Sequence, residues 1–145
     1  MAKILENKLL EKIKFKGGLV YKTKVVGAAR NTGYISTIKK RRRYLPDLKS
    51  KILAFRAGAE RQAFNTRIQG SAADIIKLAM IRAYERIPKE AKIILTVHDE
   101  IVTVTPDHLG DETREAIREA MEGINLLDVP LVADIKVVDR WGQAK

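Results

Sequence analysis

Residues 93–104 read Ile-Ile-Leu-Thr-Val-His-Asp-Glu-Ile-Val-Thr-Val, and this stretch decides the fold that the sequence predicts. Two β-like runs flank a short polar segment, which is the pattern of a β-hairpin. The tip of that hairpin would carry Asp99 and Glu100, with His98 just before them. Adjacent carboxylates repel each other, so a cation such as Mg²⁺ or Mn²⁺ would favour the turn. A solvated turn is the alternative, because His, Asp and Glu are ordinary turn residues.

A second polar pattern lies thirty residues earlier. Arg61, Asn65 and Gln69 recur every four residues, so a continuous helix would align them on one face. These side chains can donate hydrogen bonds to base edges, and the minor groove presents acceptors that carry little sequence information. The stripe therefore predicts a surface that holds a duplex without reading its sequence. A solvated helix face is the alternative.

Positive charge is concentrated in the first third of the chain. Residues 1–50 contain 14 Lys and Arg against 3 Asp and Glu, whereas residues 51–145 contain 14 against 15. The densest cluster ends in Arg41, Arg42 and Arg43. Such a cluster predicts contact with the phosphates of a polyanion, which would position nucleic acid without selecting sequence. A generic basic loop is the alternative.

Length and composition limit the class of protein. A chain of 145 residues is one domain by the usual length prior, and it is long enough to bury a core. It has no cysteine, which excludes disulfides and thiolate metal sites. Its apolar runs are too short to span a bilayer, and its N-terminus has no signal-peptide core. We therefore expect a soluble cytoplasmic protein that has no membrane partner.

The expected fold class is α+β, with a small antiparallel sheet and helices packed on one face. Periodicity and turn signals predict the elements. In chain order they are a helix over 4–13, an extended piece at 19–21, a helix over 25–31, a hairpin of 34–37 with 42–45, a helix over 54–64, a helix from Ser71, the hairpin around Asp99, a helix over 107–121 and a strand over 131–138.

The helix from Ser71 is predicted by a capping pattern, in which Ser71 is followed three residues later by Asp74. Its buried stripe would be formed by Ile75, Ile76, Ala79, Met80 and Ala83. A break near Gly70 would separate Gln69 from the helix that carries Arg61 and Asn65. The three donors would then converge only through tertiary packing.

The two motifs and the blocks around them resemble the C-terminal half of the palm of family A DNA polymerases, the bacterial DNA polymerase I family. The likeness begins near Gly33 and ends near Trp141, and it includes residues 41–47, 59–77 and 97–100. It implies a partial polymerase palm over 33–145. Residues 1–32 would then be a separate basic N-terminal segment of unknown role.

The resemblance implies a DNA-directed DNA polymerase, a nucleotidyltransferase of DNA replication. In that chemistry two Mg²⁺ ions about 3.5–4 Å apart assist the attack of a primer hydroxyl on a deoxynucleoside triphosphate. By resemblance, Asp99 and Glu100 are catalytic metal ligands, Glu100 the weaker of the two. His98 looks like the residue that steadies the primer terminus. The stripe on residues 61–69 looks like the contact with the minor groove of the primer-template.

The resemblance also indicates what these residues lack. The family needs a second aspartate from an earlier strand, yet Asp47 is the first Asp here and only Glu6 and Glu11 precede it. We therefore expect half of a metal site, inactive as an isolated chain and completed by a complementary polymerase chain. Lys40 stands where relatives usually have Gly, and Arg67, where many have Pro, would add charge on the DNA side. A non-catalytic DNA-binding module and an inert truncated remnant are the alternatives.

Overall fold

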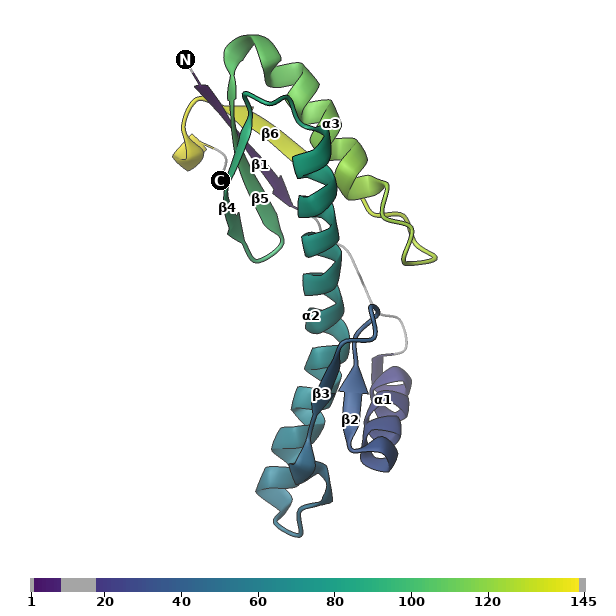
Figure 1. The fold of residues 1–145 in the computed structure, drawn as a ribbon. Helices are drawn as coiled ribbons and strands as arrows, with labels where there is room; N and C mark the ends of the chain where they lie inside the picture. The colour runs from purple at the N-terminus through teal and green to yellow at the C-terminus, as the bar shows by residue number, and fades with distance from the viewer. Residues whose placement is uncertain (1, 9–17, 144–145) are drawn as a thin grey trace. The chain divides into compact units, whose positions relative to one another are not determined.

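The computed structural model describes residues 2–8 and 18–143 and confirms the α+β fold class (Figure 1). The chain forms two compact units, Met1–Lys12 with Ile75–Lys145 and Ile13–Asp74, and each is described by itself. The elements are β1 (Ala2–Lys8), α1 (Gly18–Thr32), β2 (Tyr34–Ser36), β3 (Arg42–Tyr44), η1 (Pro46–Lys49), α2 (Leu53–Arg86), β4 (Lys92–Val97), β5 (Glu100–Pro106), η2 (Asp107–Leu109), α3 (Gly110–Glu122), β6 (Asp134–Val138) and η3 (Trp141–Gln143).

The first unit contains a four-stranded antiparallel sheet in the order β4-β5-β1-β6. The predicted hairpin is confirmed, because β4 and β5 pair directly on either side of a two-residue turn. The predicted last strand is confirmed in shorter form as β6. A register shift between Ile93 and Leu95 interrupts the β4–β5 ladder. The open edges of this sheet are therefore β4 and β6.

The prediction of an N-terminal helix is wrong for residues 4–8, which belong to the inner strand β1. This strand pairs over its whole length with β5, from Ala2 opposite Pro106 to Lys8 opposite Glu100, and its other edge pairs with β6. Two ladders of backbone hydrogen bonds outweigh a local helical periodicity. Residues 9–13 of the predicted helix lie outside the described residues.

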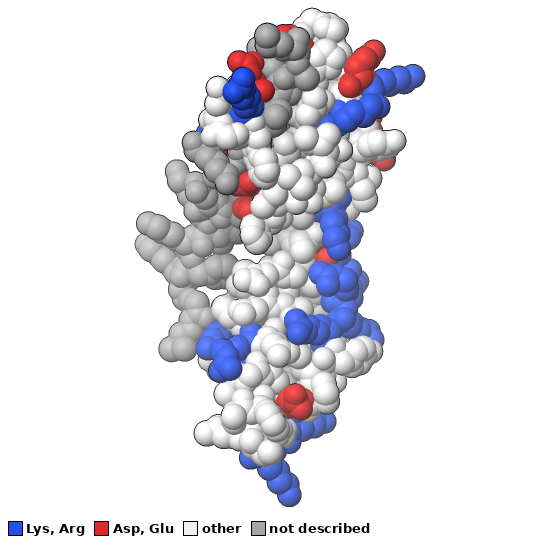
Figure 2. Space-filling view, turned by 90° about the vertical axis from the view of Figure 1, so that its left-hand side faces the viewer, with Lys and Arg blue, Asp and Glu red and all other residues white. Residues whose placement is uncertain are grey.

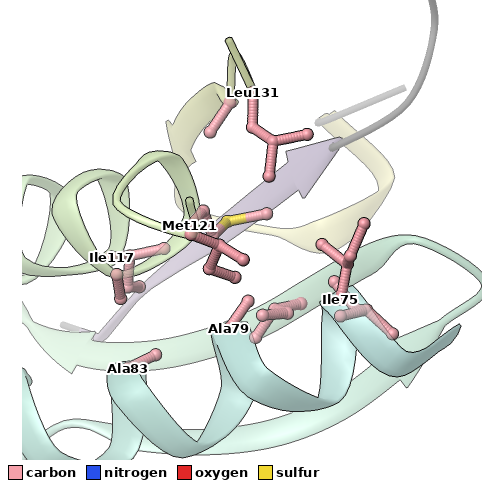
Figure 3. Packing of buried hydrophobic residues seen from close by; sticks show 11 residues of the cluster. Ile75, Ala79, Ala83, Ile117, Met121 and Leu131 are labelled. Carbon is pink, nitrogen blue, oxygen red and sulfur yellow. The ribbon is translucent and has the colours of Figure 1, made fainter. Parts of the chain in front are cut away.

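The core of this unit lies between the sheet and two helices. Ile75, Ala79 and Ala83 of α2 face Ile117 and Met121 of α3, as Figure 3 shows. The predicted stripe on α2 is thus confirmed, although Met80 is only partly buried. The remaining members of the core are Ile76, Ile101, Ala120, Ile124, Leu131 and Ala133.

Strand β5 presents alternate residues to the two faces of the sheet. The hydroxyls of Thr105 and Thr113 of α3 are hydrogen-bonded at 2.9 Å, and Ile101 belongs to the core that the helices share. Because side chains alternate along a strand, Ile101 and Thr105 face the helices, whereas Glu100 and Val102 face the opposite side. The helices of this unit therefore pack on one face of the sheet, as predicted.

The second unit packs α1, the β2–β3 hairpin and the first part of α2 around a smaller core. The predicted hairpin is confirmed, with Tyr34 opposite Tyr44. The extended piece predicted at 19–21 is wrong, because those residues belong to α1. The ring of Tyr21 meets that of Phe64 edge-on, with centroids 6.3 Å apart. The core consists of Val25, Ala29, Ile35, Leu45, Leu48, Ala59 and Ala63.

Helix α2 continues through Gly70, so the predicted break is wrong. A Cβ atom on Gly70 would lie 2.9 Å from Cγ2 of Thr37, closer than real Cβ contacts come. Glycine is therefore needed here for close packing of the hairpin turn. The hydroxyl of Ser71 donates to the carbonyl of Arg67 and accepts from the backbone N–H of Ile38 at 3.0 Å. Ser71 thus links the helix to the hairpin instead of starting a new helix.

The turn between β2 and β3 holds Lys40 in the left-handed region, with φ of 63°. Its N–H donates to the carbonyl of Thr37 at 3.0 Å, and the N–H of Thr37 donates to the carbonyl of Arg41 at 2.9 Å. A side chain in this region carries a steric cost that glycine avoids. The turn is formed nevertheless, with lysine at the position where the resemblance predicts glycine.

In the part of the chain that the structure describes, no helix combines the length and the apolar character that crossing a membrane requires.

Replacing Gly70 with Ala tests the packing explanation. We expect Gly70→Ala to lower the free energy of unfolding by about 1–3 kcal/mol, because the new methyl group must push Thr37 away. Gly58, which lies in the same helix, is the matched control. Its Cβ would meet only the end of Arg61 at 3.9 Å, so Gly58→Ala should stabilise by about 0.5–1 kcal/mol. Urea unfolding measures both, and two equal changes would contradict the explanation.

Candidate functional site

His98 and Asp99 form the tip of the β4–β5 hairpin, between the directly paired Val97 and Glu100. His98 has φ of 55°, the left-handed backbone that two-residue hairpin turns require. Its side chain is exposed, whereas Asp99 and Glu100 are partly exposed. The hairpin therefore places the two carboxylates one after the other, Asp99 in the turn and Glu100 at the start of β5.

Glu100 begins the strand on the sheet face that points away from the helices of its unit, the side that it shares with Val102. The backbone position opposite Glu100 on the neighbouring strand is Lys8 of β1. The strand next to the acidic pair thus carries a basic residue at this level.

The carboxylates of Asp99 and Glu100 are the type of ligand that Mg²⁺ prefers, but two carboxylates alone do not complete its coordination. Mg²⁺ prefers six oxygen ligands and is usually held by one or two carboxylates together with waters and phosphate oxygens. Over residues 2–8 and 18–143 there is no group of three or more His, Cys, Asp or Glu that could hold a metal ion. Asp99 and Glu100 can therefore contribute ligands, but two ions need further ligands from elsewhere.

Helix α2 aligns the predicted donor stripe. Arg61, Asn65 and Gln69 are all exposed, whereas Ala63 and Thr66 between them are buried against the hairpin side. Successive donors are about 6 Å apart along the axis, since each residue rises 1.5 Å. The stripe lies in the unit Ile13–Asp74, and the acidic hairpin lies in the other unit. Their convergence on one DNA molecule stays a prediction.

Arg41 is bound within its own unit. Its Nε and Nη2 donate to Oδ1 of Asp74 at 3.1 and 3.0 Å, and Nη2 also donates to the carbonyl of Gly70 at 3.1 Å. The Asp74 side chain is 8% exposed and that of Arg41 53%. Arg41 thus closes the hairpin turn onto α2, and Asp74 offsets much of its charge. Its predicted contact with phosphate stays a prediction.

The environment of Asp74 lowers its pKa. Burial by itself raises the pKa, but the Thr37 side chain, the Arg41 guanidinium and the Lys39 backbone N–H favour the carboxylate more strongly. The result is a pKa below the usual 3.8. The carboxylate is therefore part of the folded unit at neutral pH.

Arg42 and Arg43 are both exposed but are held differently. The guanidinium of Arg42 lies over the ring of Tyr34, 4.7 Å from its centroid, which is a cation–π contact. Arg43 donates to the side-chain oxygens of Gln62 at 3.2 Å and Thr66 at 3.4 Å. None of these partners is acidic, so both arginines keep their charge for the phosphate contact that the sequence predicts.

Arg67 does not extend the charged surface as expected. It is partly buried, and its Nη1 donates to the carbonyl of Ser36 at 2.9 Å while its Nε donates to the hydroxyl of Tyr21 at 3.3 Å. The side chain therefore ties β2 and α1 to α2. Spacing alone could not reveal this role, because its partners lie more than thirty residues away in sequence.

The unit with the stripe is strongly basic. Residues 13–74 contain 15 Lys and Arg against 3 Asp and Glu, a net charge of +12. Two of the three acids, Glu60 and Asp74, are ion-paired with arginines. Figure 2 shows blue side chains spread widely over one face of this unit and little red. Such a surface attracts polyanions.

Comparisons with known proteins agree with these features. The family model described as DNA polymerase family A matches residues 7–143. The thermostable DNA polymerase I of Thermus filiformis is 43% identical over 117 residues, which cover 80% of this chain and 14% of that protein. DNA polymerase I of Streptococcus pneumoniae serotype 4 is 42% identical over 135 residues, covering 91% and 15%. The chain thus spans about one seventh of these relatives.

A solved structure shares the fold. It is the POL domain of Pol1 from M. smegmatis in a complex with DNA primer-template and dNTP. The TM-score is 0.81 at 42% sequence identity, and the match covers 85% of this chain and 22% of that one.

The link between Asp74 and Arg41 can be tested by pH. Because the pKa of Asp74 is lower in the folded chain than in the unfolded chain, its carboxylate stabilises the fold above about pH 3.8 and less as the pH falls through the lowered value. We expect Asp74→Asn to lower the unfolding free energy by about 1–3 kcal/mol at pH 7. The difference from the wild type should shrink below pH 3.8.

Asp47→Asn is the matched control, because Asp47 is exposed and should change stability by less than about 0.5 kcal/mol. Urea unfolding at pH 7 and at low pH measures both variants. A deficit of Asp74→Asn that stays constant with pH would contradict the role of its carboxylate.

Proposed function

The chain belongs to DNA polymerase family A, and from this membership we propose that it is a C-terminal palm portion of a DNA-directed DNA polymerase. It would contribute one half of a two-metal nucleotidyl-transfer site together with minor-groove contacts to a primer-template. The observation that carries the proposal is the hairpin tip, where Asp99 and Glu100 follow one another on partly exposed positions of a strand turn. The unbroken donor stripe on α2 supports it.

The proposed roles follow from the chemistry of each side chain. Asp99 and Glu100 would hold divalent ions, which when bound supply charge neutralisation at the reacting phosphate. The exposed His98 at the turn would hydrogen-bond the primer terminus. Arg61, Asn65 and Gln69 would donate to minor-groove acceptors, which keeps the duplex in place whatever its sequence. A deoxynucleoside triphosphate and a complementary polymerase chain complete the proposed set of partners.

The sheet limits how a complementary chain could supply a second aspartate. Strand β5 already has two neighbours, β4 and β1, and β1 is itself covered by β6. A further strand could pair only with the outer edge of β4 or β6, or after β1 leaves the sheet. Otherwise its carboxylate would have to approach from the sheet face on which Glu100 lies, where Val102 is only 1% exposed. The proposal therefore requires that face to be accessible to the partner.

A DNA-binding module without catalysis is the second candidate. It is favoured by the net charge of +12 on residues 13–74 and by the occupied position beside β5. This function needs the stripe and the arginines, but it does not need Asp99. The two candidates are therefore separable by variants.

Primer extension tests the catalytic proposal. The chain is mixed with a polypeptide that carries the earlier palm strand and fingers of a family A polymerase, and neither is expected to extend a primer alone. The mixture should extend it, and Asp99→Ala should reduce the rate by at least about a hundredfold. Asp111→Ala removes an exposed carboxylate of α3 and should leave the rate unchanged. Extension by a mixture that contains Asp99→Ala at the full rate would refute the assigned role of Asp99.

Duplex binding tests the stripe. We expect Arg61→Ala and Asn65→Ala each to weaken duplex binding by about 1–3 kcal/mol. Only Arg61→Ala can also reduce the salt dependence, by about one unit of slope if it contacts phosphate. Arg86→Ala removes one exposed charge from the far end of α2 and is the control. Fluorescence anisotropy at several salt concentrations measures all three. An effect of Arg86→Ala as large as the others would show that only bulk charge matters.

A further inference from the structure

A pocket of about 390 Å³ lies beside the start of α2, within the unit Ile13–Asp74. Its lining comes from three elements and the loop between two of them, so sequence spacing gives no sign of it. The lining residues are Arg30 of α1, Leu48 and Lys49 of η1, Ser50, and Arg56 of α2.

Two of the three cations in the pocket have no ion pair among the residues that the structure describes. Arg30 is ion-paired with Glu60. Neither Lys49 nor Arg56 has an acidic partner within salt-bridge distance among the described residues. Arg56 donates one hydrogen bond, from Nη1 to the carbonyl of Ser50 at 3.4 Å, and the guanidinium has further N–H groups to offer. A concave site with unpaired guanidinium and ammonium groups fits a phosphate group.

Exposed apolar side chains adjoin this pocket along the chain. Ile52, Leu53 and Phe55 are 56%, 68% and 57% exposed, directly between Ser50 and Arg56 of the lining. Phe55 does not itself line the pocket, but it directly precedes Arg56, which does. Proteins bind single-stranded nucleic acid with exposed aromatic rings and cations, because bases stack on the ring while phosphates meet the charges. Free phosphate has no base that could stack on the ring, so a site for phosphate alone would not involve Phe55.

The pocket is distinct from the donor stripe. Arg56 precedes Arg61 by five residues, which places it about 140° away around the helix at 3.6 residues per turn. A duplex lying on the stripe would therefore not cover Arg56 directly. A ligand of the pocket would therefore bind separately from a duplex that lies on the stripe.

We propose that the pocket and Phe55 form a binding site for single-stranded nucleic acid, in which Arg56 and Lys49 hold a backbone phosphate and a base stacks on Phe55. This site goes beyond the proposed function, because it requires neither Asp99 nor the stripe. Its chemistry is tolerant of sequence, since every base has a face that can stack.

The test is fluorescence anisotropy of the whole chain with a labelled oligothymidylate of about 16 nucleotides, within the usual site size. We expect Phe55→Ala and Arg56→Gln each to weaken binding about tenfold and Lys49→Gln about threefold. Each lost cation should lower the salt slope by about 0.7, whereas Phe55→Ala should leave the slope unchanged. Lys51→Gln removes an exposed charge that does not line the pocket, and it should change affinity by less than about twofold.

Three results would overturn the proposal. One is an effect of Lys51→Gln equal to that of Lys49→Gln, which would indicate bulk charge only. Another is full affinity of Phe55→Ala together with competition by millimolar inorganic phosphate, which would indicate a small-anion site. The third is full affinity of Arg56→Gln. Arg56→Lys keeps the positive charge but loses the planar guanidinium group, so the salt slope should stay unchanged. Thermal melting of this variant shows whether it is folded.

Blunt duplex measured in parallel separates this inference from the proposed function. If the pocket does not bind single-stranded nucleic acid, Arg61→Ala and Asn65→Ala should still weaken the binding of duplex. If the donor stripe does not bind duplex, the pocket should still bind single-stranded nucleic acid.

Discussion

The close approach of Thr37 to Gly70 is the packing constraint on which the rest of the structure depends. Because no Cβ stands between them, the β2–β3 turn lies directly against α2, which is unbroken at this point. Ser71 then bonds to the turn, and Asp74 holds Arg41. One continuous helix consequently carries the donor stripe in one unit and the core positions of the other.

Pairing within the sheet constrains function in a different way. The N-terminal strand β1 lies between β5 and β6, so the backbone groups of β5 are satisfied on both sides. A strand whose backbone N–H and C=O groups are hydrogen-bonded along both edges cannot pair with a further strand. A partner would therefore have to reach the acidic hairpin at its tip, where Asp99 and Glu100 are partly exposed, and not along the edge of β5.

The basic residues of the unit Ile13–Asp74 fall into two groups, according to the partners of their side chains. Arg41 and Arg67 are engaged inside their unit, where they join the hairpin to α1 and α2. Arg42, Arg43, Lys49 and Arg56 have no acidic partner among the described residues, and their charge is available to an anion. The unit thus uses part of its excess positive charge for structure and presents the remainder on its surface.

The sequence by itself determined the hairpin around Asp99, the fold class and the buried positions of α2, because alternation, helical spacing and turn chemistry are local. It gave the four-residue spacing of the donors, but not the unbroken helix that places Gln69 in line with Arg61 and Asn65. Tertiary structure decided the rest. Residues 2–8 became a strand because two neighbouring strands pair with them, and Gly70, where the sequence predicted a break, lies inside α2 with Thr37 packed against it. The inward role of Arg67 and the pocket around Arg56 depend on residues distant in sequence, which no local pattern brings together.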